Sequence, residues 1–152
     1  MIAARTLATL SLVLSLASCS DGSDTADASA APLAATFENV QAVFSRACAF
    51  SSCHGSASRP GGGLRLVAGE SYAALVRAPS TQVARLMRVA PGDASASWLM
   101  IKVEGTLSAV SECRATGNAC GVSMPARSEL LAASERDLIR RWIAAGAPGP
   151  SM

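Results

Sequence analysis

The segment Cys48–His54 constrains this chain more than any other part of its sequence. It places two cysteines five positions apart, and the second is followed directly by the only histidine of the 152 residues. Covalent attachment of haem needs two thiols, which add across the porphyrin vinyl groups, and an imidazole that binds the iron. The usual motif is C-x-x-C-H, and this segment is a C-x4-C-H variant. It predicts a haem site with Cys48 and Cys53 as thiols and His54 as an iron ligand.

The chain begins with a segment typical of export. Arg5 precedes an apolar run, Leu7 to Leu16, which is too short to span a bilayer of about 30 Å and fits a signal peptide. The run ends in Leu-Ala-Ser-Cys, which resembles the lipobox of bacterial lipoproteins. This resemblance implies that residues 1–18 are a signal peptide and that the Cys19 sulfur carries a lipid. An ordinary secretory signal with an incidental cysteine is the alternative.

The composition changes sharply after the signal. Residues 19–35 are rich in Ala, Ser and Asp, which predicts a flexible tether, whereas residues 36–148 can form one domain and residues 149–152 are a tail. The expected location is the cell envelope, with the lipid on Cys19 holding the domain on a membrane that faces the periplasm, or on the outer membrane. Ser20 after Cys19 favours the outer membrane only weakly.

Charge and aromatic content narrow the function. The net charge is +2 and no run of Lys or Arg occurs, so nucleic-acid binding is not expected. Aromatic residues make up 4% of the chain, and a core built from Ala, Leu and Val alone would be thin. A buried porphyrin would supply the missing core volume. We expect a monomer that exchanges electrons with a protein partner that the sequence does not identify.

The cysteines divide into three groups without remainder. Cys19 is the lipidation candidate, Cys48 and Cys53 are the haem thiols, and Cys113 and Cys120 are left over. In an exported chain this last pair is a plausible disulfide, and free thiols are the weaker alternative.

Two helices are predicted by cap residues and apolar periodicity. Thr36 can cap a helix that runs into Cys48, and the terminal helix is predicted over Glu135–Ala145, with Ser134 and Asp137 as a capping box. Shorter helices are expected over Glu70–Arg77 and, after a cap at Asp93 or Ser95, through Trp98–Val103. Residues 58–63 should be loop, residues 105–123 irregular, and residues 83–89 fit either a helix or an extended segment. The fold class is all-α, a small domain with substantial loops.

The order of these features resembles the class I cytochromes c. The motifs that carry the resemblance are Cys48…Cys53-His54, the turn Pro91-Gly92-Asp93, the pair Met124-Pro125 and the ending Trp142-Ile-Ala-Ala-Gly-Ala147. The resemblance implies N- and C-terminal helices that pack together, with long loops around a haem. It also implies that Phe44 packs on the terminal helix against Trp142.

The resemblance also implies roles for single residues. His54 is the expected proximal ligand, and its second ring N–H should be held by a backbone carbonyl of residues 58–63, with Pro60 the named candidate. Met124 is the expected sixth ligand, because Pro125 keeps it out of helical geometry; Met87 and Met100 compete, although Met100 fits a core role better. Further candidates, for the apolar pocket and for the propionates, are Leu64, Leu66, Tyr72, Leu75, Trp98, Leu99, Arg59 and Arg65.

An iron with both axial positions filled suits electron transfer rather than catalysis, so no enzyme is expected. The alternative is a haem-free lipoprotein stapled by two disulfides, Cys48–Cys53 and Cys113–Cys120, that serves as a binding or structural module. An enzyme that uses Cys53 or His54 has little support, since no acid partner for a triad is evident. A zinc or blue-copper site is also disfavoured by the single histidine.

Overall fold

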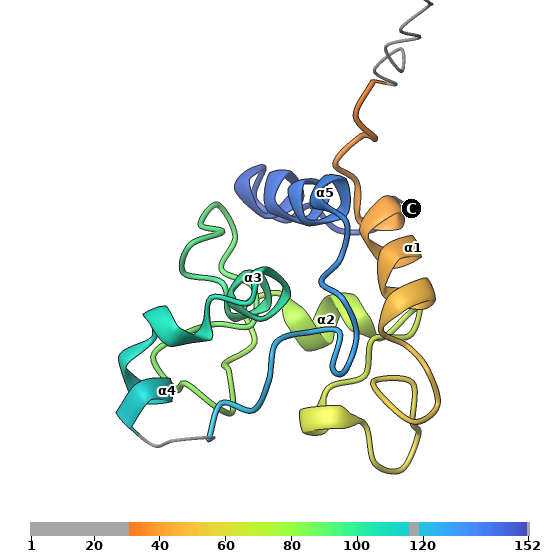
Figure 1. Ribbon diagram of the computed structural model, residues 1–152. Helices are drawn as coiled ribbons and strands as arrows, with labels where there is room; N and C mark the ends of the chain where they lie inside the picture. Colours follow the sequence, from red (N-terminus) through yellow and green to blue (C-terminus); the bar gives the residue numbers. More distant parts are fainter. Residues whose placement is uncertain (1–30, 116–118, 152) are drawn as a thin grey trace, which may run out of the picture. The chain divides into compact units, whose positions relative to one another are not determined.

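The computed structural model describes residues 31–115 and 119–151. The expected signal peptide, the lipidation site Cys19 and most of the tether lie outside these residues. The described chain contains five α-helices and no β-strand, which confirms the all-α prediction (Figure 1). The helices are α1 (Phe37–Ala47), α2 (Ser71–Leu75), α3 (Trp98–Glu104), α4 (Ser111–Ala115) and α5 (Ala133–Ala144), with two 3₁₀ turns, η1 (Gly61–Gly63) and η2 (Leu107–Ala109).

Helix α1 forms as its sequence predicts. The Thr36 hydroxyl accepts the N–H of Asn39 at 3.4 Å, and the buried side chains repeat at helical spacing along one face. The helix ends at Ala47, and the N–H of Cys48 still donates to the carbonyl of Phe44. Cys48 is thus the first residue to leave the helix, at a position that the helix itself fixes.

Helix α5 begins two residues earlier than predicted, at Ala133, and this changes its cap. Ser134 already lies inside the helix, so the predicted box of Ser134 and Asp137 does not form. Instead the N–H of Ala132 donates to the Glu135 carboxylate at 3.1 Å, while Asp137 accepts from Arg141 at 2.7 Å. The correction follows from register, because a side chain caps a helix only from the residue that precedes it.

The main core lies where α1 and α3 pack against α5 (Figure 1). Trp142 is completely buried in it, and its ring centroid lies 5.5 Å from that of Phe37. Phe44, the partner that the sequence analysis named for Trp142, is fully buried in the same cluster, but the ring contact of Trp142 is with Phe37. The packing of the first helix on the last is therefore confirmed. The buried members of the main core are Phe37, Val40, Val43, Phe44, Leu66, Leu75, Val89, Leu99, Met100, Val103, Leu131, Leu138, Ile139, Trp142, Ile143 and Ala147.

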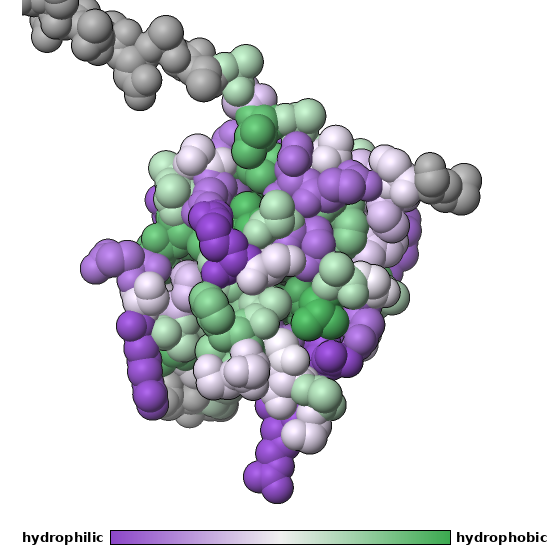
Figure 2. Space-filling view, turned by 90° about the vertical axis from the view of Figure 1, so that its right-hand side faces the viewer, coloured by the Kyte–Doolittle hydropathy of each residue, from purple (hydrophilic) through white to green (hydrophobic). Residues whose placement is uncertain are grey.

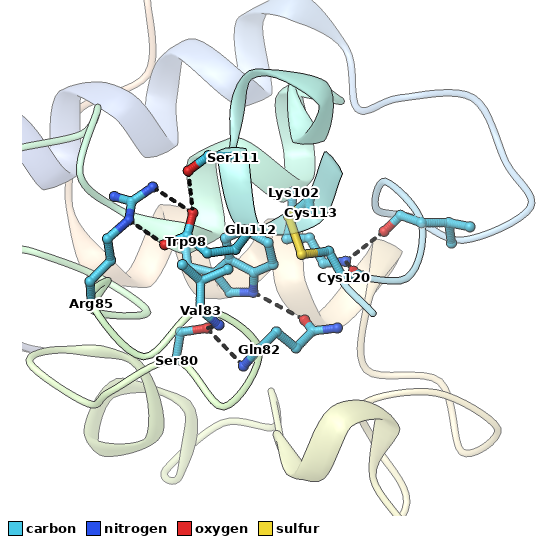
Figure 3. The surroundings of a disulfide bond; sticks show 11 residues. Ser80, Gln82, Val83, Arg85, Trp98, Lys102, Ser111, Glu112, Cys113 and Cys120 are labelled. Atoms are coloured by element: carbon cyan, nitrogen blue, oxygen red, sulfur yellow. Dashed lines mark hydrogen bonds and ion pairs between the residues drawn. A yellow bond between two sulfur atoms is a disulfide. The ribbon is translucent and has the colours of Figure 1, made fainter. Parts of the chain in front are cut away.

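A second, smaller cluster surrounds a disulfide. The Cys113–Cys120 bond is formed, as predicted, with the two Cα atoms 5.3 Å apart (Figure 3). The prediction that residues 105–123 are irregular is wrong in part, because η2 and α4 lie within them. We call this cluster the disulfide lobe; its buried members are Val83, Leu86, Trp98, Val110, Cys113 and Cys120.

Long loops connect most of the helices, among them residues 48–70 between α1 and α2 and residues 76–97 between α2 and α3. Residues 83–89 form neither a helix nor a strand, and isolated backbone bridges such as Val76–Val89 and Met87–Ser97 hold them. Before α3, the Asp93 carboxylate accepts the N–H of Ala96 at 2.9 Å, so Asp93 stabilises the preceding turn and does not cap the helix. None of the helices in the described ranges is long and apolar enough to cross a bilayer.

Candidate functional site

The Cys48–His54 segment forms a closed turn directly after α1. The N–H of His54 donates to the carbonyl of Cys48 at 3.2 Å, and those of Cys53 and Gly55 donate to the carbonyl of Phe50. A Cβ atom at Gly55 would lie 2.1 Å from the carbonyl oxygen of Ala49, so only glycine fits this position. The four-residue spacer is therefore taken up by a compact, hydrogen-bonded turn.

The two thiols of the turn are not bonded to each other. Cys48 is half-buried against the main core, and Cys53 is exposed. Burial raises the pKa of the Cys48 thiol to about 11, with a smaller contribution from the neighbouring Cys53. Cys48 is thus protonated at neutral pH, which does not suit a thiolate ligand of a metal ion.

The His54 ring is held by one backbone carbonyl. Its Nδ1 lies 2.9 Å from the carbonyl oxygen of Leu64. Since a carbonyl can only accept, Nδ1 carries the proton, and the lone pair of Nε2 is free to bind a metal. The acceptor is a backbone carbonyl, as predicted, but it belongs to Leu64, which lies one residue beyond the predicted range 58–63, and not to Pro60. The Pro60 carbonyl instead accepts the N–H of Gly63 in η1, and this turn brings the chain back to the imidazole.

A glycine lies against the face of the same ring. A Cβ atom at Gly61 would be 3.3 Å from Cε1 of His54, closer than side chains normally pack. The Gly61 N–H donates to the Cys53 carbonyl at 3.1 Å, and the His54 carbonyl accepts from Leu66 at 2.9 Å. Backbone contacts from residues 61–66 therefore hold the imidazole in one orientation, as a metal-binding histidine requires.

Met124 reaches the main core from the other end of the chain. Its side chain is half-buried against this cluster, as are those of Cys48 and Leu64. The N–H of Met124 donates to the Lys102 carbonyl at 2.9 Å. Of the competing methionines, Met100 is buried in α3 at 2% exposure, as expected for a core residue, and Met87 is 45% exposed.

The predicted pocket residues divide between the two clusters. Leu66, Leu75 and Leu99 fill the main core, and Leu64 and Tyr72 lie at its edge. Trp98 is a correction, because it belongs to the disulfide lobe, where its indole N–H donates to Gln82 at 3.1 Å (Figure 3).

Exposed apolar side chains flank the site on both of its loops. Phe50 is 55% exposed beside the cysteines, and Val122 and Leu130 are 51% and 38% exposed on either side of Met124. Figure 2, which views the right-hand side of Figure 1, shows hydrophobic residues in separate patches between hydrophilic ones. A flat apolar group bound between these loops would cover surface that is otherwise costly to expose.

The two arginines proposed for the propionates differ in their surroundings. Arg65 donates to both carboxylate oxygens of Glu70, at 2.7 and 2.9 Å, while its buried Nε has no hydrogen-bond partner among the described atoms. Arg59 is exposed, and within residues 31–115 and 119–151 it makes no ion pair. Arg59 can therefore bind an anionic group through its guanidinium, whereas the Arg65 guanidinium is paired with Glu70 and its Nε is buried.

Among the described residues, cavities lie away from the Cys48–His54 turn. One of about 450 Å³ borders α3 and η2, and one of about 220 Å³ lies between α1 and α5. Neither is lined by Cys48, Cys53, His54 or Met124.

These residues fit a haem by the chemistry of their donors: two unbonded thiols, one imidazole nitrogen with a free lone pair, and a thioether on the same core. Comparison with known proteins adds nothing to this geometry, because no family model, no curated protein and no solved structure matches the chain.

Proposed function

We propose that this protein is a c-type cytochrome, a lipid-anchored electron carrier that binds haem covalently. Cys48 and Cys53 would hold the porphyrin, and His54 and Met124 would bind the iron. The observation that carries the proposal is the His54–Leu64 contact, which leaves Nε2 of His54 free beside two unbonded thiols.

The attachment needs only what the turn provides. Each thiol adds to one vinyl group: a carbon–sulfur bond forms at one vinyl carbon, and the thiol hydrogen ends on the other. No oxidant is consumed. Both thiols must be reduced for this step, and both are unbonded in the turn.

The bound iron would supply a centre that gains and loses one electron. With His54 and Met124 both binding the iron, no position would be open to a substrate, so electron transfer rather than catalysis is the expected activity. Glycine packing and the Leu64 carbonyl would hold the imidazole in one orientation in both oxidation states. The lipid on Cys19, inferred from the sequence, would keep the carrier at a membrane of the cell envelope, where it meets its redox partner.

The test is expression of the full chain together with a haem-attachment system. We expect a c-type spectrum in pyridine and alkali, and haem that stays on the protein in a denaturing gel. His54→Ala and Cys53→Ala should abolish normal loading. The matched control is Cys113→Ala/Cys120→Ala, which removes the other cysteine pair and should retain the haem.

The same preparation decides for the alternative. If the wild-type chain carries no covalent haem and mass spectrometry finds Cys48 linked to Cys53, the protein is the haem-free module with two disulfides. If haem is bound but Cys48→Ala changes neither the absorption spectrum nor the amount of covalently bound haem found by mass spectrometry, the haem is attached through one thioether, at Cys53, and not through two.

The sixth ligand has its own test. Met124→Ala should remove the weak near-infrared sulfur-to-iron band of the oxidised protein, because this band requires a thioether on the iron. Met87→Ala, at an exposed methionine, is the matched control and should keep the band. Loss of the band in Met87→Ala instead would move the ligand to Met87.

A further inference from the structure

Lys102 is a buried charge without an acidic partner. It is the only lysine of the chain, it lies in the last turn of α3, and it is 7% exposed. In the described ranges no carboxylate pairs with it; its ammonium lies 5.3 Å from the centre of the Trp98 ring. Moving a charged ammonium out of water costs free energy. An apolar residue would avoid this cost, so the charge calls for a specific role.

Backbone carbonyls of one short segment accept hydrogen bonds from the ammonium. Its Nζ donates to the carbonyl of Cys120 at 2.6 Å and to that of Val122 at 2.7 Å. The N–H of Met124 donates in turn to the backbone carbonyl of Lys102 at 2.9 Å, a carbonyl near the end of α3. Lys102 thus forms hydrogen bonds with residues 120, 122 and 124, and we call these three hydrogen bonds the Lys102 clamp.

The disulfide fixes the far end of the same segment. Cys120, whose carbonyl Lys102 holds, is bonded to Cys113 in α4 (Figure 3). The backbone that leads to Met124 is therefore tied to two different helices, α4 through sulfur and α3 through the lysine. Between these ties Gly121 has a φ of +64°, a conformation that favours glycine.

We propose that Lys102 is the positioning residue of the sulfur ligand: its clamp holds the backbone of residues 120–124 so that the Met124 thioether stays on the iron. The inference rests on the proposed haem site. A thioether is a neutral, weak ligand, so its occupancy depends on how firmly the chain holds it near the metal. The clamp supplies this without contact to the iron.

The experiment compares three variants of the haem-loaded full chain. Lys102→Leu removes the ammonium and should lose the near-infrared sulfur-to-iron band, while covalent haem and helical circular dichroism are retained. Added imidazole, which competes with Met124, should bind the oxidised protein about tenfold more tightly, as expected when charge-assisted hydrogen bonds are lost. Lys102→Arg, which keeps charge and donors, should restore part of the band.

Arg88→Leu is the matched control. Arg88 also donates to a backbone carbonyl, that of Ala74 at 2.9 Å, but not to the segment 120–124. It should leave the band and the imidazole affinity unchanged. A Lys102→Leu protein that keeps both wild-type properties overturns the proposal, and so does equal loss in Arg88→Leu.

If Lys102→Leu does not fold, chemical modification of the wild-type protein tests the clamp instead. Because Lys102 is the only lysine, an amine-acylating reagent has one side-chain target, which peptide mass spectrometry distinguishes from the terminal amine. Acylation should be slow in the folded protein, and each labelled molecule should lose the band. Fast acylation with an intact band overturns the clamp.

The two proposals fail in different ways. Wild-type protein without covalent haem refutes the cytochrome. Wild-type protein with covalent haem but without the band refutes Met124 ligation, and with it the role of Lys102, while leaving His54 and the thioethers in place.

Discussion

The main core and the disulfide lobe each hold one pair of cysteines, and they treat the pair differently. The main core buries sixteen of the described residues; Cys48 at its edge and the exposed Cys53 in the same turn are unbonded. The disulfide lobe buries six, and two of these are the bonded Cys113 and Cys120. A large apolar cluster holds its helices together without a covalent link, whereas a small one needs a staple. The unbonded pair thus lies beside the larger cluster and the bonded pair within the smaller one.

The largest expected effect is on the main core. Trp142→Ala empties a fully buried position where α1 and α5 meet, and should lower the free energy of unfolding by about 3–5 kcal/mol. Urea denaturation measures the loss. Met87→Ala, at an exposed side chain, is the control and should change stability by roughly 0.5 kcal/mol or less. A loss below about 1 kcal/mol for Trp142→Ala would mean that the α1–α5 contact is not the centre of the fold.

The disulfide lobe should respond locally. Cys113→Ala/Cys120→Ala opens a loop with a sequence separation of 7, for which chain entropy gives about 2–3 kcal/mol. The two tryptophan indoles report the regions separately, because Trp98 is bonded to Gln82 in the lobe and Trp142 to Pro148 beside the main core. We expect faster hydrogen exchange at the Trp98 indole and little change at Trp142. Equal acceleration at both would make the two regions one cooperative unit.

The same comparison explains what the sequence could predict. Helices α1 and α5 are long enough to display a cap and several turns of apolar spacing, so both were predicted, with errors only at the ends. Helix α4 has five residues and η2 three, too few for a periodic pattern. Their positions depend on the disulfide and on contacts with Leu86 and Trp98, which are distant in sequence.

Within the site, residue types were predictable but backbone partners were not. The motif itself indicated Cys48, Cys53 and His54, yet the acceptor of the His54 N–H depends on how η1 turns, and only the fold selects Leu64 over Pro60. Lys102 was missed altogether. Its one signal was a lone lysine within an apolar helix, which is read more readily as a surface residue than as a buried clamp.

A smaller effect is expected where the main core meets the motif. Gly61→Ala would place a methyl group against the His54 ring, which must shift by a few tenths of an ångström, at a cost of about 1 kcal/mol. The NMR signals of the His54 ring should move accordingly. Gly62→Ala is the matched control: it meets open space but has a φ of +60°, so it should cost about 1 kcal/mol of backbone strain and leave those signals unchanged. Equal changes of the His54 ring signals in both variants would show that these signals respond to any distortion of the loop and not to the contact with residue 61.

The smallest effect concerns a charge on the outside of the disulfide lobe. The Arg85 guanidinium donates to Glu112 at 2.6 and 3.1 Å and lowers the pKa of this carboxyl from 4.5 to about 2. Because the folded pKa is lowered, the contribution to stability is present above pH 4.5 and is lost as the pH falls through 2. Glu112→Gln should therefore be slightly less stable than wild type at pH 7, with a difference that shrinks over this window.

Hydrogen exchange at the Trp98 and Trp142 indoles tests whether the Arg85–Glu112 pair stabilises only the disulfide lobe. The pair is exposed, so the difference should also shrink at high salt, as screening of a surface ion pair requires. Exchange at Trp98 should respond to Glu112→Gln, since Arg85 and Glu112 join the segment before α3 to α4 across the lobe. Exchange at Trp142 should not, because none of its contacts in the main core involves this pair. A pH-dependent change at Trp142 alone would contradict the assignment of Glu112 to the disulfide lobe.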